Sequence, residues 1–415
     1  MIQPRISLLH PTGNPFARQA AIALWEAHAL QEVITCLNYA PSPQLDQLLQ
    51  RFLKPLHQEL ERRRWLPPTL PCTTYPQAEL QRIALLRSQL YRPLNLNPQT
   101  LADRVYAVLD RKVAQNHLNN LNGVYAYEDG AASTFSEAKK RGVQCFYDLP
   151  IVHYRHSQTL QQQEVEQFPQ LAPALQSLQE SPEKLARKDQ EIALADLIFV
   201  PSTIVKQSLI NVGVTTEKII VLPFGSPHDY FLPQPKLDST FRALFVGRVG
   251  PRKGVHYLLQ AWQDLNLPDA ELSLIGFNEF PPNWLSPYQE IFHYIPSIPH
   301  HLLAQYYTQA SVFVFPSLIE GLALVLLEAM SCGIPIITTP NSGGSDIITD
   351  GVEGFIIPSR DINALQDKLE WCYRHPDTLQ EMGIAARQKA ESLNWGVYRE
   401  GLMKAIQAHY FTLSP

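Results

Sequence analysis

Cysteine is scarce in this chain: five cysteines are scattered over 415 residues, and no two of them form a Cys-x-x-Cys pair. An odd, dispersed set of this kind predicts neither a disulfide framework nor a zinc site, and it fits a reducing cytoplasm. Positive charge is not in excess either, because the net charge of −5 argues against nucleic acid as the main partner. No apolar run reaches transmembrane length. Pro4 and Arg5 interrupt the N-terminal apolar run, so no signal peptide is expected.

The residues that are present describe a globular protein long enough for two domains. Hydrophobic residues make up 45% of the chain and charged residues 18%, and 415 residues exceed the usual size of one domain. Thirty-four prolines indicate many rigid loops. Four of them lie between residues 223 and 235, where no hydrophobic periodicity is seen, so we expect a linker at residues 223–236.

A β-α-β unit is predicted between Ser311 and Pro340. Residues 312–315 form a short β-branched and aromatic run, which is typical of a central parallel strand buried on both faces. Good helix formers follow, and Gly333 provides a C-cap. Residues 335–339 form a second buried strand. Ligands bind at the carboxyl end of such a first strand, and the free N–H groups of the helix form a site for an anion.

Two glutamates flank the start of that predicted helix. Glu320 lies in the strand-to-helix loop beside Gly321, and Glu328 lies about two turns into the helix. Carboxylate oxygens accept hydrogen bonds from sugar hydroxyls, so the pair fits a ligand that carries both phosphate and sugar. The alternative is that Glu320 is only favoured by the helix dipole and that Glu328 is a solvated helix residue. The spacing alone leaves both interpretations open.

A second stretch places cations in a similar loop. Residues 243–247 are predicted as a buried strand, and the Gly-rich loop that follows contains Arg248 and Lys253 and ends at Gly254. A planar guanidinium and a compact ammonium group are both suited to binding a diphosphate.

Together the two stretches resemble the retaining nucleotide-sugar glycosyltransferases of family 4. That family has a Gly-Arg…Lys-Gly loop and a Glu-x7-Glu motif with a Met-x-x-Gly-x-Pro tail, and both occur here in the same order and separation. The resemblance implies an α/β fold of two Rossmann-like, doubly wound parallel-sheet domains that face each other across a cleft (GT-B). The expected division is an acceptor-side domain over residues 1–222, the linker, and a donor-binding domain over residues 237–394. A C-terminal helix at residues 395–415 would cross back to the first domain.

The resemblance also assigns roles in the second domain. Arg248, Lys253 and the helix N–H groups would stabilise the departing diphosphate, Glu320 would contact the donor sugar, and Glu328 would contact the ribose. The remaining donor-side positions are Gly13, Gly247, Ile298, Gly321, Leu322, Ala323 and Leu324. The sequence departs from the family at Ala323, where a second glycine is usual, and a positive φ there would strain alanine. Asp346 stands near the place of a glutamate in the family's Gly-Gly-x-x-Glu turn.

The first domain matches the family less closely. A strand over residues 5–10 leads to Gly13, which is followed by Asn14 where the family has another glycine, so a tight turn without a ligand is the alternative. A helix is expected from residue 19 to residue 30. The acceptor-side candidates are Asn14, Glu128, Asp148, His153 and His156. His153 is also a catalytic candidate, although an ordinary loop histidine explains it equally well. A metal site at His153 and His156 lacks further ligands.

A helical insertion is expected around residues 41–100. Apolar residues recur there at helical spacing, and the polar side of the predicted helix includes Arg51 and Lys54. Such a helix could contact an anionic membrane or the acceptor; core packing with a solvated polar face is the alternative. The members of the apolar stripe are Leu45, Leu48, Leu49, Phe52, Leu53, Leu56 and Leu60.

The resulting prediction is a cytoplasmic, retaining glycosyltransferase of the hexosyltransferase type. It would move a sugar from a nucleoside diphosphate sugar to an acceptor that the residues do not identify: a sugar, a lipid-linked molecule or a small molecule. No cofactor and no metal are expected, because cations stand at the diphosphate and the second domain has no Asp-x-Asp at a strand end. Peripheral contact with the inner face of a membrane stays open. The alternatives are a non-catalytic nucleotide-sugar-binding or partner subunit and a nucleotide-sugar epimerase; a glycogen-phosphorylase-like enzyme would need a cofactor lysine, for which no motif is present.

Overall fold

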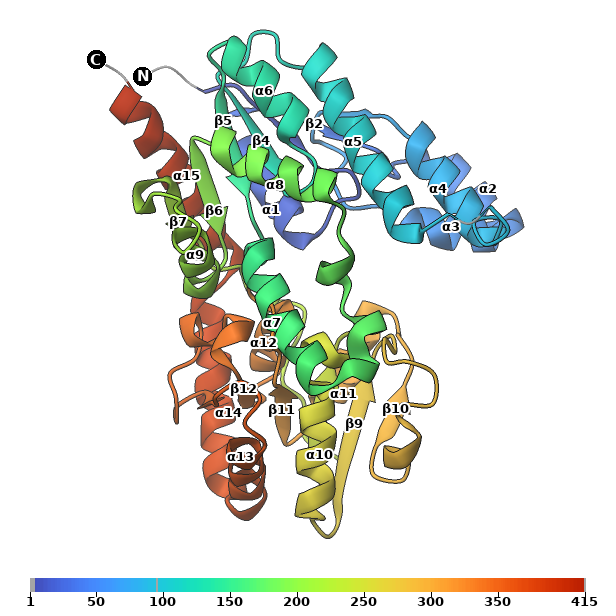
Figure 1. The fold of residues 1–415 in the computed structure, drawn as a ribbon, viewed down its shortest axis with the longest axis vertical. Coiled ribbons are helices and arrows are strands. Elements are labelled where there is room, and N and C mark those ends of the chain that lie inside the picture. Colours follow the sequence, from blue (N-terminus) through green and yellow to red (C-terminus); the bar gives the residue numbers. More distant parts are fainter. Residues whose placement is uncertain (1–3, 95, 414–415) are drawn as a thin grey trace.

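The computed structural model describes residues 4–94 and 96–413, which fold into two parallel-sheet domains (Figure 1). The first sheet has the strand order β3-β2-β1-β4-β5-β6-β7, and the second has the order β10-β9-β8-β11-β12-β13. Each order reverses next to its first strand, β1 or β8, and such a reversal places a crevice at the carboxyl ends of the strands. The predicted GT-B arrangement of two Rossmann-like domains is therefore confirmed.

The strands are short and mostly buried, because continuous apolar runs are covered by helices on both faces. The first sheet contains β1 (Ile6–Leu9), β2 (Leu30–Thr35), β3 (Cys72–Thr74), β4 (Gly123–Tyr127), β5 (Gln144–Asp148), β6 (Leu197–Val200) and β7 (Ile219–Val221). The second contains β8 (Phe241–Val246), β9 (Ala270–Ile275), β10 (His293–Ile295), β11 (Val312–Phe315), β12 (Ile336–Thr338) and β13 (Gly354–Ile356). Every residue of β4 and of β11 is buried.

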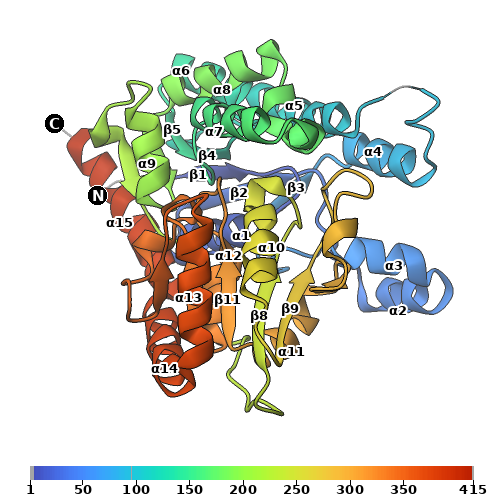
Figure 2. The same cartoon turned by 60° about the horizontal axis from the view of Figure 1, so that its bottom comes forward.

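Helices cover both faces of the first sheet (Figure 2). Leu8 of β1 packs in one apolar cluster with α1 and α15, whereas the adjacent Leu9 packs in another with α5, α6 and α8. This alternation is what a strand with two buried faces requires. The helices that follow these strands in the chain are α1 (Pro15–Glu26), α2 (Pro43–Phe52), α3 (Lys54–Glu61), α4 (Gln77–Arg87), α5 (Pro98–Asn116), α6 (Ala132–Lys140), α7 (Tyr154–Gln167), α8 (Pro182–Leu194) and α9 (Thr203–Ile210).

In the second domain, α10 packs with α13, and α12 packs with α14. The helices here are α10 (Val255–Leu265), α11 (Ala304–Tyr307), α12 (Leu324–Ser331), α13 (Ile362–Arg374), α14 (Pro376–Ser392) and α15 (Trp395–Leu413). The last of them returns to the first domain, as predicted, and lies against α1 (Figure 1). Arg399 of α15 forms an ion pair with Glu26 at 2.9 Å and donates to Gln19 at 2.7 Å.

A second connection between the domains is α7, which reaches from the first domain onto α10 (Figure 1). Glu164 near the end of α7 is fully buried. Its carboxylate accepts hydrogen bonds from His256 at 3.0 Å and from Tyr257 at 3.2 Å, and it forms an ion pair with Arg360. These hydrogen bonds and the ion pair lower the Glu164 pKa despite its burial, which by itself would raise it. The charge is therefore retained at the domain junction.

Two predicted elements differ from the structure. The first helix ends at Glu26 instead of residue 30, because His28 adopts a left-handed φ of 54° that terminates it, and Leu30 begins β2. The expected insertion is not one amphipathic helix, because the chain breaks at Leu53 between α2 and α3. It also contributes the edge strand β3.

Within the residues described, the structure contains no helix that combines the length and the apolar character needed to cross a membrane.

Candidate functional site

The two predicted motifs lie side by side, because β8 and β11 are neighbours in the second sheet. The Leu318 N–H donates to the Arg252 carbonyl at 3.0 Å, which joins the loop after β11 to the loop after β8. Gly254 has a φ of 68°, and a Cβ there would lie 2.0 Å from the Pro316 carbonyl oxygen. Only glycine can adopt this φ and leave room for the Pro316 carbonyl, so the geometry of the two loops depends on Gly254.

An ion pair between Lys253 and Glu320 lies where these two loops meet. The two side chains are 9% and 14% exposed. The Lys253 ammonium also lies 5.3 Å from the centre of the Phe315 ring, within the range of a cation–π contact. Arg252 approaches the same carboxylate at 3.6 Å and donates to the Ile319 carbonyl at 2.9 Å. Glu320 therefore has two cations beside it, of which the sequence reasoning singled out only one.

Arg248 lies at the exposed rim of the same loop. Its Nη1 donates to Glu279 at 2.5 Å, and its side chain is 57% exposed whereas that of Glu279 is 9% exposed. Glu279 follows β9 and is held in place by a 2.9 Å hydrogen bond from its own N–H to the Val249 carbonyl. A guanidinium has five N–H donors, so Arg248 can bind an additional anion while it keeps this partner.

The N-terminus of α12 opens beside these cations without a capping side chain. Within the part of the chain that the structure describes, no side chain caps this helix start, and its first turn contains no acidic residue. The Ala323 N–H donates to the Ser342 carbonyl at 3.1 Å and the Leu326 N–H donates to the Ala323 carbonyl at 3.0 Å. Among the residues described, the N–H groups of Leu324 and Val325 are left to favour an anion. Ala323, which precedes the helix, has φ −74° and ψ 112°, an ordinary extended conformation. The strain that a positive φ would impose on alanine is absent.

Glu328 is buried inside the protein, with 6% exposure, so the interpretation as a solvated helix residue is wrong. Its carboxylate accepts a hydrogen bond from His300 at 2.8 Å and another from the Tyr307 hydroxyl at 2.9 Å. The hydrogen bond to Glu328 raises the pKa of His300. His300 itself is 57% exposed and follows Ile298, the predicted neighbour of the base, by two residues.

Gly321 is the point at which the predicted donor motif contacts the first domain. It pairs with Ile151 in an isolated antiparallel bridge, and a Cβ on Gly321 would lie 1.8 Å from the Pro150 carbonyl oxygen. Ser202 donates to the Gly321 carbonyl at 2.6 Å. Gly321 is therefore required by the close approach of two backbones, whereas the sequence suggested close approach to a ligand.

Asp346 makes a second contact of this kind. Its carboxylate accepts hydrogen bonds from the Thr203 N–H at 3.0 Å and from the Thr203 hydroxyl at 2.8 Å, at the start of α9. The acid in the Gly-Gly turn thus binds an N-terminal helix end of the first domain, and this contact joins the two domains.

Two acidic acceptor-side candidates lie at strand ends of the first sheet. Asp148 ends β5, is 3% exposed and accepts a hydrogen bond from the Tyr125 hydroxyl at 2.7 Å. Burial raises the pKa of Asp148 to about 7. Glu128 follows β4 and forms an ion pair with Lys188 at 3.2 Å. Burial also raises the pKa of Glu128 to about 7, against the opposing effect of Lys188.

The predicted histidines begin α7. His153 is the N-cap residue and is buried; its Nδ1 accepts from the Arg155 N–H at 3.3 Å, and its Nε2 lies 3.6 Å from Asp189. Burial lowers the pKa of His153 to about 4, so the ring is neutral at pH 7. Burial also lowers the pKa of His156. Among the residues described, neither histidine belongs to a group of three or more metal-ligand side chains.

The loop after β1 is occupied by the protein's own side chains. Gly13 has a φ of 69°, and a Cβ there would lie 2.2 Å from the Trp65 ring. The His10 ring accepts from the Gly13 N–H at 2.8 Å, and the Asn14 carboxamide caps α1 by accepting from Ala17 N–H at 2.7 Å. Each residue therefore has a local structural role, which fits the tight-turn alternative.

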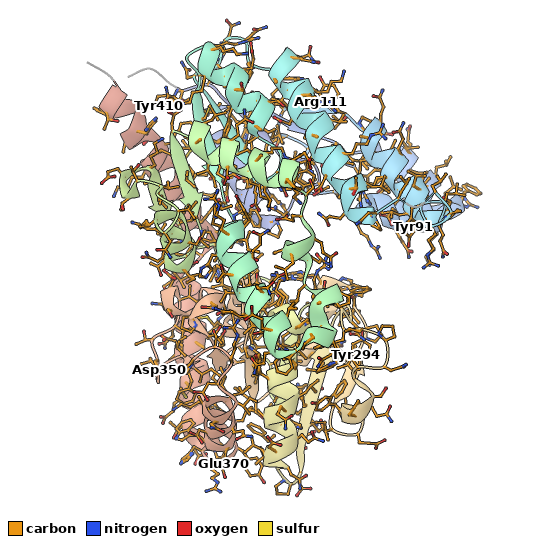
Figure 3. The ribbon with its side chains drawn as sticks, viewed as in Figure 1. Tyr91, Arg111, Tyr294, Asp350, Glu370 and Tyr410 are labelled. Atoms are coloured by element: carbon orange, nitrogen blue, oxygen red, sulfur yellow. The ribbon has the colours of Figure 1, made fainter. Side chains whose placement is uncertain are left out.

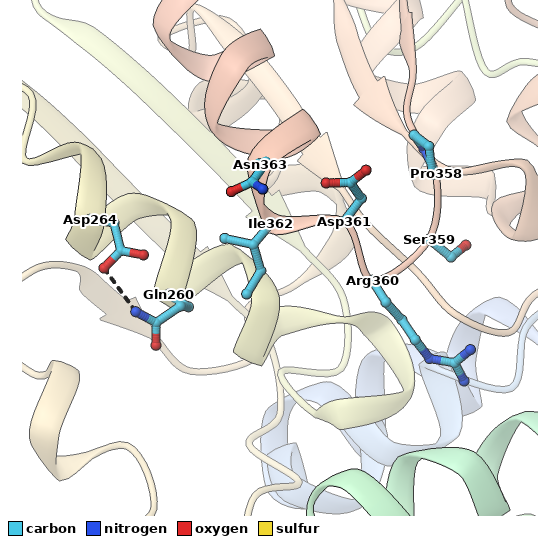
Figure 4. Close-up of a pocket in the computed structure, with 8 residues that line it drawn as sticks. All are labelled: Gln260, Asp264, Pro358, Ser359, Arg360, Asp361, Ile362 and Asn363. Carbon is cyan, nitrogen blue, oxygen red and sulfur yellow. Dashed lines mark hydrogen bonds between the residues drawn. The ribbon is translucent and has the colours of Figure 1, made fainter.

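Two other features lie apart from these residues. A surface pocket is formed by α10 and the loop before α13, and none of the predicted residues lines it (Figure 4). Asp46, His57 and Glu61 are close enough to share a metal ion. However, Arg64 already contacts both carboxylates, at 3.3 Å and 2.6 Å, and its charge opposes a cation there.

Comparison with known proteins supports the sequence resemblance. Residues 232–389 match the family model for "Glycosyl transferases group 1". The sulfoquinovosyl transferase SQD2 of Arabidopsis thaliana is 30% identical over 48% of this chain and 42% of that protein. The D-inositol 3-phosphate glycosyltransferase of Kribbella flavida is 24% identical over 64% of this chain and 67% of that protein. The match therefore spans less than half of the first relative and two thirds of the second.

Solved structures extend the likeness to nearly the whole chain. Sucrose-phosphate synthase from Thermosynechococcus elongatus superposes with a TM-score of 0.68 at 19% identity, over 99% of this chain and all of that one. Anabaena HepE, solved in complex with UDP, has a TM-score of 0.63 at 14% identity, over 97% of this chain and all of that one. The chain thus has the GT-B fold of glycosyltransferases, and its second domain matches the group 1 glycosyl transferases.

Proposed function

We propose that the protein is a retaining glycosyltransferase that uses a nucleoside diphosphate sugar as donor and needs no metal ion. The observation that carries the proposal is the buried Lys253–Glu320 ion pair beside the uncapped start of α12. Cations and free N–H groups meet there at the carboxyl ends of two central strands, where open parallel sheets bind ligands. The solved structures of HepE contain UDP and UDP-glucose, and we propose the same class of ligand here.

The cations would act on the charge that develops as the sugar leaves its diphosphate. Lys253 and the N–H groups of α12 are already in place, and Arg248 at the rim can turn toward the ligand because most of its side chain is exposed. Preorganised donors of this kind stabilise the transition state more than the ground state. They would take the place of the divalent ion that other transferases use, which is the basis of the proposed metal independence.

Glu328 would hold the nucleotide through its ribose. Each of its carboxylate oxygens has one protein donor, His300 or Tyr307, and can accept a second hydrogen bond. His300 is exposed enough to move aside when the ribose hydroxyls approach. Glu320, which is held by Lys253, would face the donor sugar. Retention would follow from front-face attack, so no carboxylate is assigned as a nucleophile.

The acceptor would enter from the first domain, near Asp148 and the loop that reaches Gly321. The second candidate function is a non-catalytic nucleotide-sugar-binding or partner subunit. It is favoured by the protein's own side chains filling the loop at Gly13, where an enzyme of this family would meet its ligands. An epimerase would need acid and base groups that face the donor sugar, and we propose no such role for the buried, neutral His153.

A thermal-shift screen of nucleoside diphosphate sugars, followed by a turnover assay, tests the proposal. A ligand at a hundred times its Kd adds about 2.7 kcal/mol to the free energy of unfolding, which such a screen detects. We expect one donor to stabilise the protein and to be hydrolysed or transferred with retention of the anomeric configuration, read by NMR. If a donor stabilises the protein but is not turned over with any class of acceptor, the non-catalytic binding subunit is favoured. If no donor stabilises the protein, the donor site is refuted.

A further inference from the structure

A lobe projects from the edge of the first domain, between β2 and α5 (Figures 1 and 2). It consists of α2, α3, β3, α4 and the described residues that follow α4, which are residues 43–94 and 96, and is called the lobe below. Its helices are joined by ion pairs, because Arg63 and Arg87 contact Glu59 of α3, and Arg63 also contacts Glu79 of α4 at 3.3 Å. Figure 3 shows Tyr91 at the outer end of the lobe.

The lobe has a higher density of exposed apolar side chains than the rest of the molecule. Of the 20 large apolar side chains that are exposed among the residues described, nine lie between Leu45 and Leu96. They include Leu48 at 52%, Phe52 at 67% and Leu94 at 58% exposure. A concentration of this kind on one part of a monomer marks an interaction surface.

The helix α2 has its amphipathic pattern turned outward. Its polar residue Asp46 faces the protein, where it accepts hydrogen bonds from Tyr39 at 2.8 Å and from His57 at 3.0 Å. The stripe that contains Leu48 and Phe52 faces solvent, and no residue of α2 is buried. A surface helix normally directs such a stripe into the core. Core packing is therefore wrong for the five exposed members of the stripe, whereas Leu49 and Leu60 are half-buried.

The charge of the lobe is opposite in sign to that of the rest of the protein. Residues 43–96 contain eight Lys or Arg and four Asp or Glu, a net charge of +4, in a chain whose net charge is −5. Among the described residues, Arg51, Lys54 and Arg92 form no ion pair. Arg51 lies 5.3 Å from the centre of the Phe52 ring, and Arg92 lies 5.8 Å from that of Tyr91. Arg51 thus borders the exposed Phe52, and Arg92 borders the half-buried Tyr91.

We propose that the lobe docks on a bilayer surface that carries anionic lipid headgroups. Phe52 and the neighbouring leucines would enter the boundary between headgroups and acyl chains, and the free cations would contact the headgroups. A second copy of the chain is disfavoured as the occupant, because a two-fold interface would bring two lobes of charge +4 together. Trp65, which follows α3, packs on Gly13 after the carboxyl end of β1, so docking would place that end of the first sheet near the membrane.

Co-sedimentation with vesicles tests the proposal without any substrate, and it is therefore independent of the proposed transfer reaction. The wild-type protein is mixed with vesicles of phosphatidylcholine alone, or of phosphatidylcholine with phosphatidylglycerol, at low and high salt. We expect binding to the anionic vesicles only, weakened by salt because headgroup attraction is screened within a Debye length. Equal binding to the neutral vesicles, or no binding to either, would overturn the assignment.

Two double variants of the lobe and one matched control locate the surface. Leu48→Gln/Phe52→Gln should weaken binding to the anionic vesicles more than tenfold, and Arg51→Gln/Lys54→Gln should weaken it about fivefold per charge. The control is Ile384→Gln/Phe411→Gln, whose side chains are 56% and 67% exposed on α14 and α15. It should bind as the wild type does, and all three variants should melt as the wild type does, since they change exposed side chains.

Two results would refute the docking surface. One is a loss of vesicle binding in the control as large as that in the lobe variants, which would mean that no particular patch is responsible. The other is a wild-type dimer in light scattering that Leu48→Gln/Phe52→Gln converts to a monomer, which would mean that a second copy covers the lobe.

Discussion

Replacing Lys253 by methionine separates the structural part of the Lys253–Glu320 pair from its part in transfer. Methionine keeps most of the side-chain volume beside Phe315 but removes the ammonium group. Glu320 is then left as a carboxylate that is 14% exposed, with Arg252 at 3.6 Å as its remaining cation among the residues described. A buried charge that loses its partner retains the cost of desolvation without the compensating attraction.

The expected loss of stability follows from that geometry. Removing one partner of a buried ion pair costs about 3–5 kcal/mol, and because Arg252 stays nearby we expect about 3 kcal/mol for Lys253→Met. Adding Glu320→Gln removes the second charge, and replacement of a whole pair is often close to neutral. The double variant should therefore recover most of the stability. Turnover should stay reduced on the order of 100- to 1,000-fold in both variants, because a preorganised cation at the diphosphate is missing.

Urea unfolding followed by circular dichroism, together with donor turnover, measures both quantities on the same preparations. The expected order of the unfolding midpoints is wild type, then the double variant slightly lower, then Lys253→Met. If Lys253→Met unfolds at the wild-type midpoint, the ion pair has been misjudged. If the double variant recovers turnover along with stability, Lys253 acts only on the fold, and its assignment to the diphosphate is wrong.

Three further predictions concern Arg248, divalent metal and Asp148. Arg248→Ala changes a side chain that is 57% exposed, so it should melt as the wild type does while donor turnover falls on the order of 100- to 1,000-fold; wild-type turnover would remove Arg248 from the site. Turnover should survive EDTA, and loss that manganese or magnesium restores would contradict a metal-free site. The Asp148 pKa of about 7 lies above that of an unfolded aspartate, so its folded form binds more protons. Its contribution should make the wild type less stable as the pH rises from about 4 to 7. Asp148→Asn should lack this decline, and identical pH profiles would show that burial does not shift the pKa.

The sequence predicts central strands well and edge elements poorly. Residues 312–315 form an uninterrupted apolar run because β11 is buried on both faces, and this signal is local. The strand β3 has three residues, too few for a periodic pattern, and it is a strand only because β2 offers it an edge. The end of α1 depends on His28 in the left-handed conformation, for which histidine gives only a weak signal.

In the candidate site, too, the residues with a local sequence pattern could be predicted and their distant partners could not. Arg248, Lys253 and Glu320 belong to loops with local glycine patterns, so the sequence could single them out. Their partners could not be found, because they come from other parts of the chain: Glu279 follows β9, and Tyr307, which binds Glu328, belongs to α11. The outward orientation of the apolar stripe of α2 could not be predicted from the sequence either, because periodicity identifies an apolar face but not the direction in which it points.

Calorimetric titration with free nucleoside diphosphates tests the central claim most directly. We predict that the wild type binds at least one of UDP, GDP and ADP. Glu328→Gln should raise its Kd about tenfold or more, since a hydrogen bond to a charged group contributes roughly 1.5–3 kcal/mol. Glu320→Gln should leave that Kd nearly unchanged while transfer collapses. Failure of all three nucleotides to bind, or equal effects of both variants on the Kd, would contradict a donor site in which Glu328 holds the ribose and Glu320 faces the sugar.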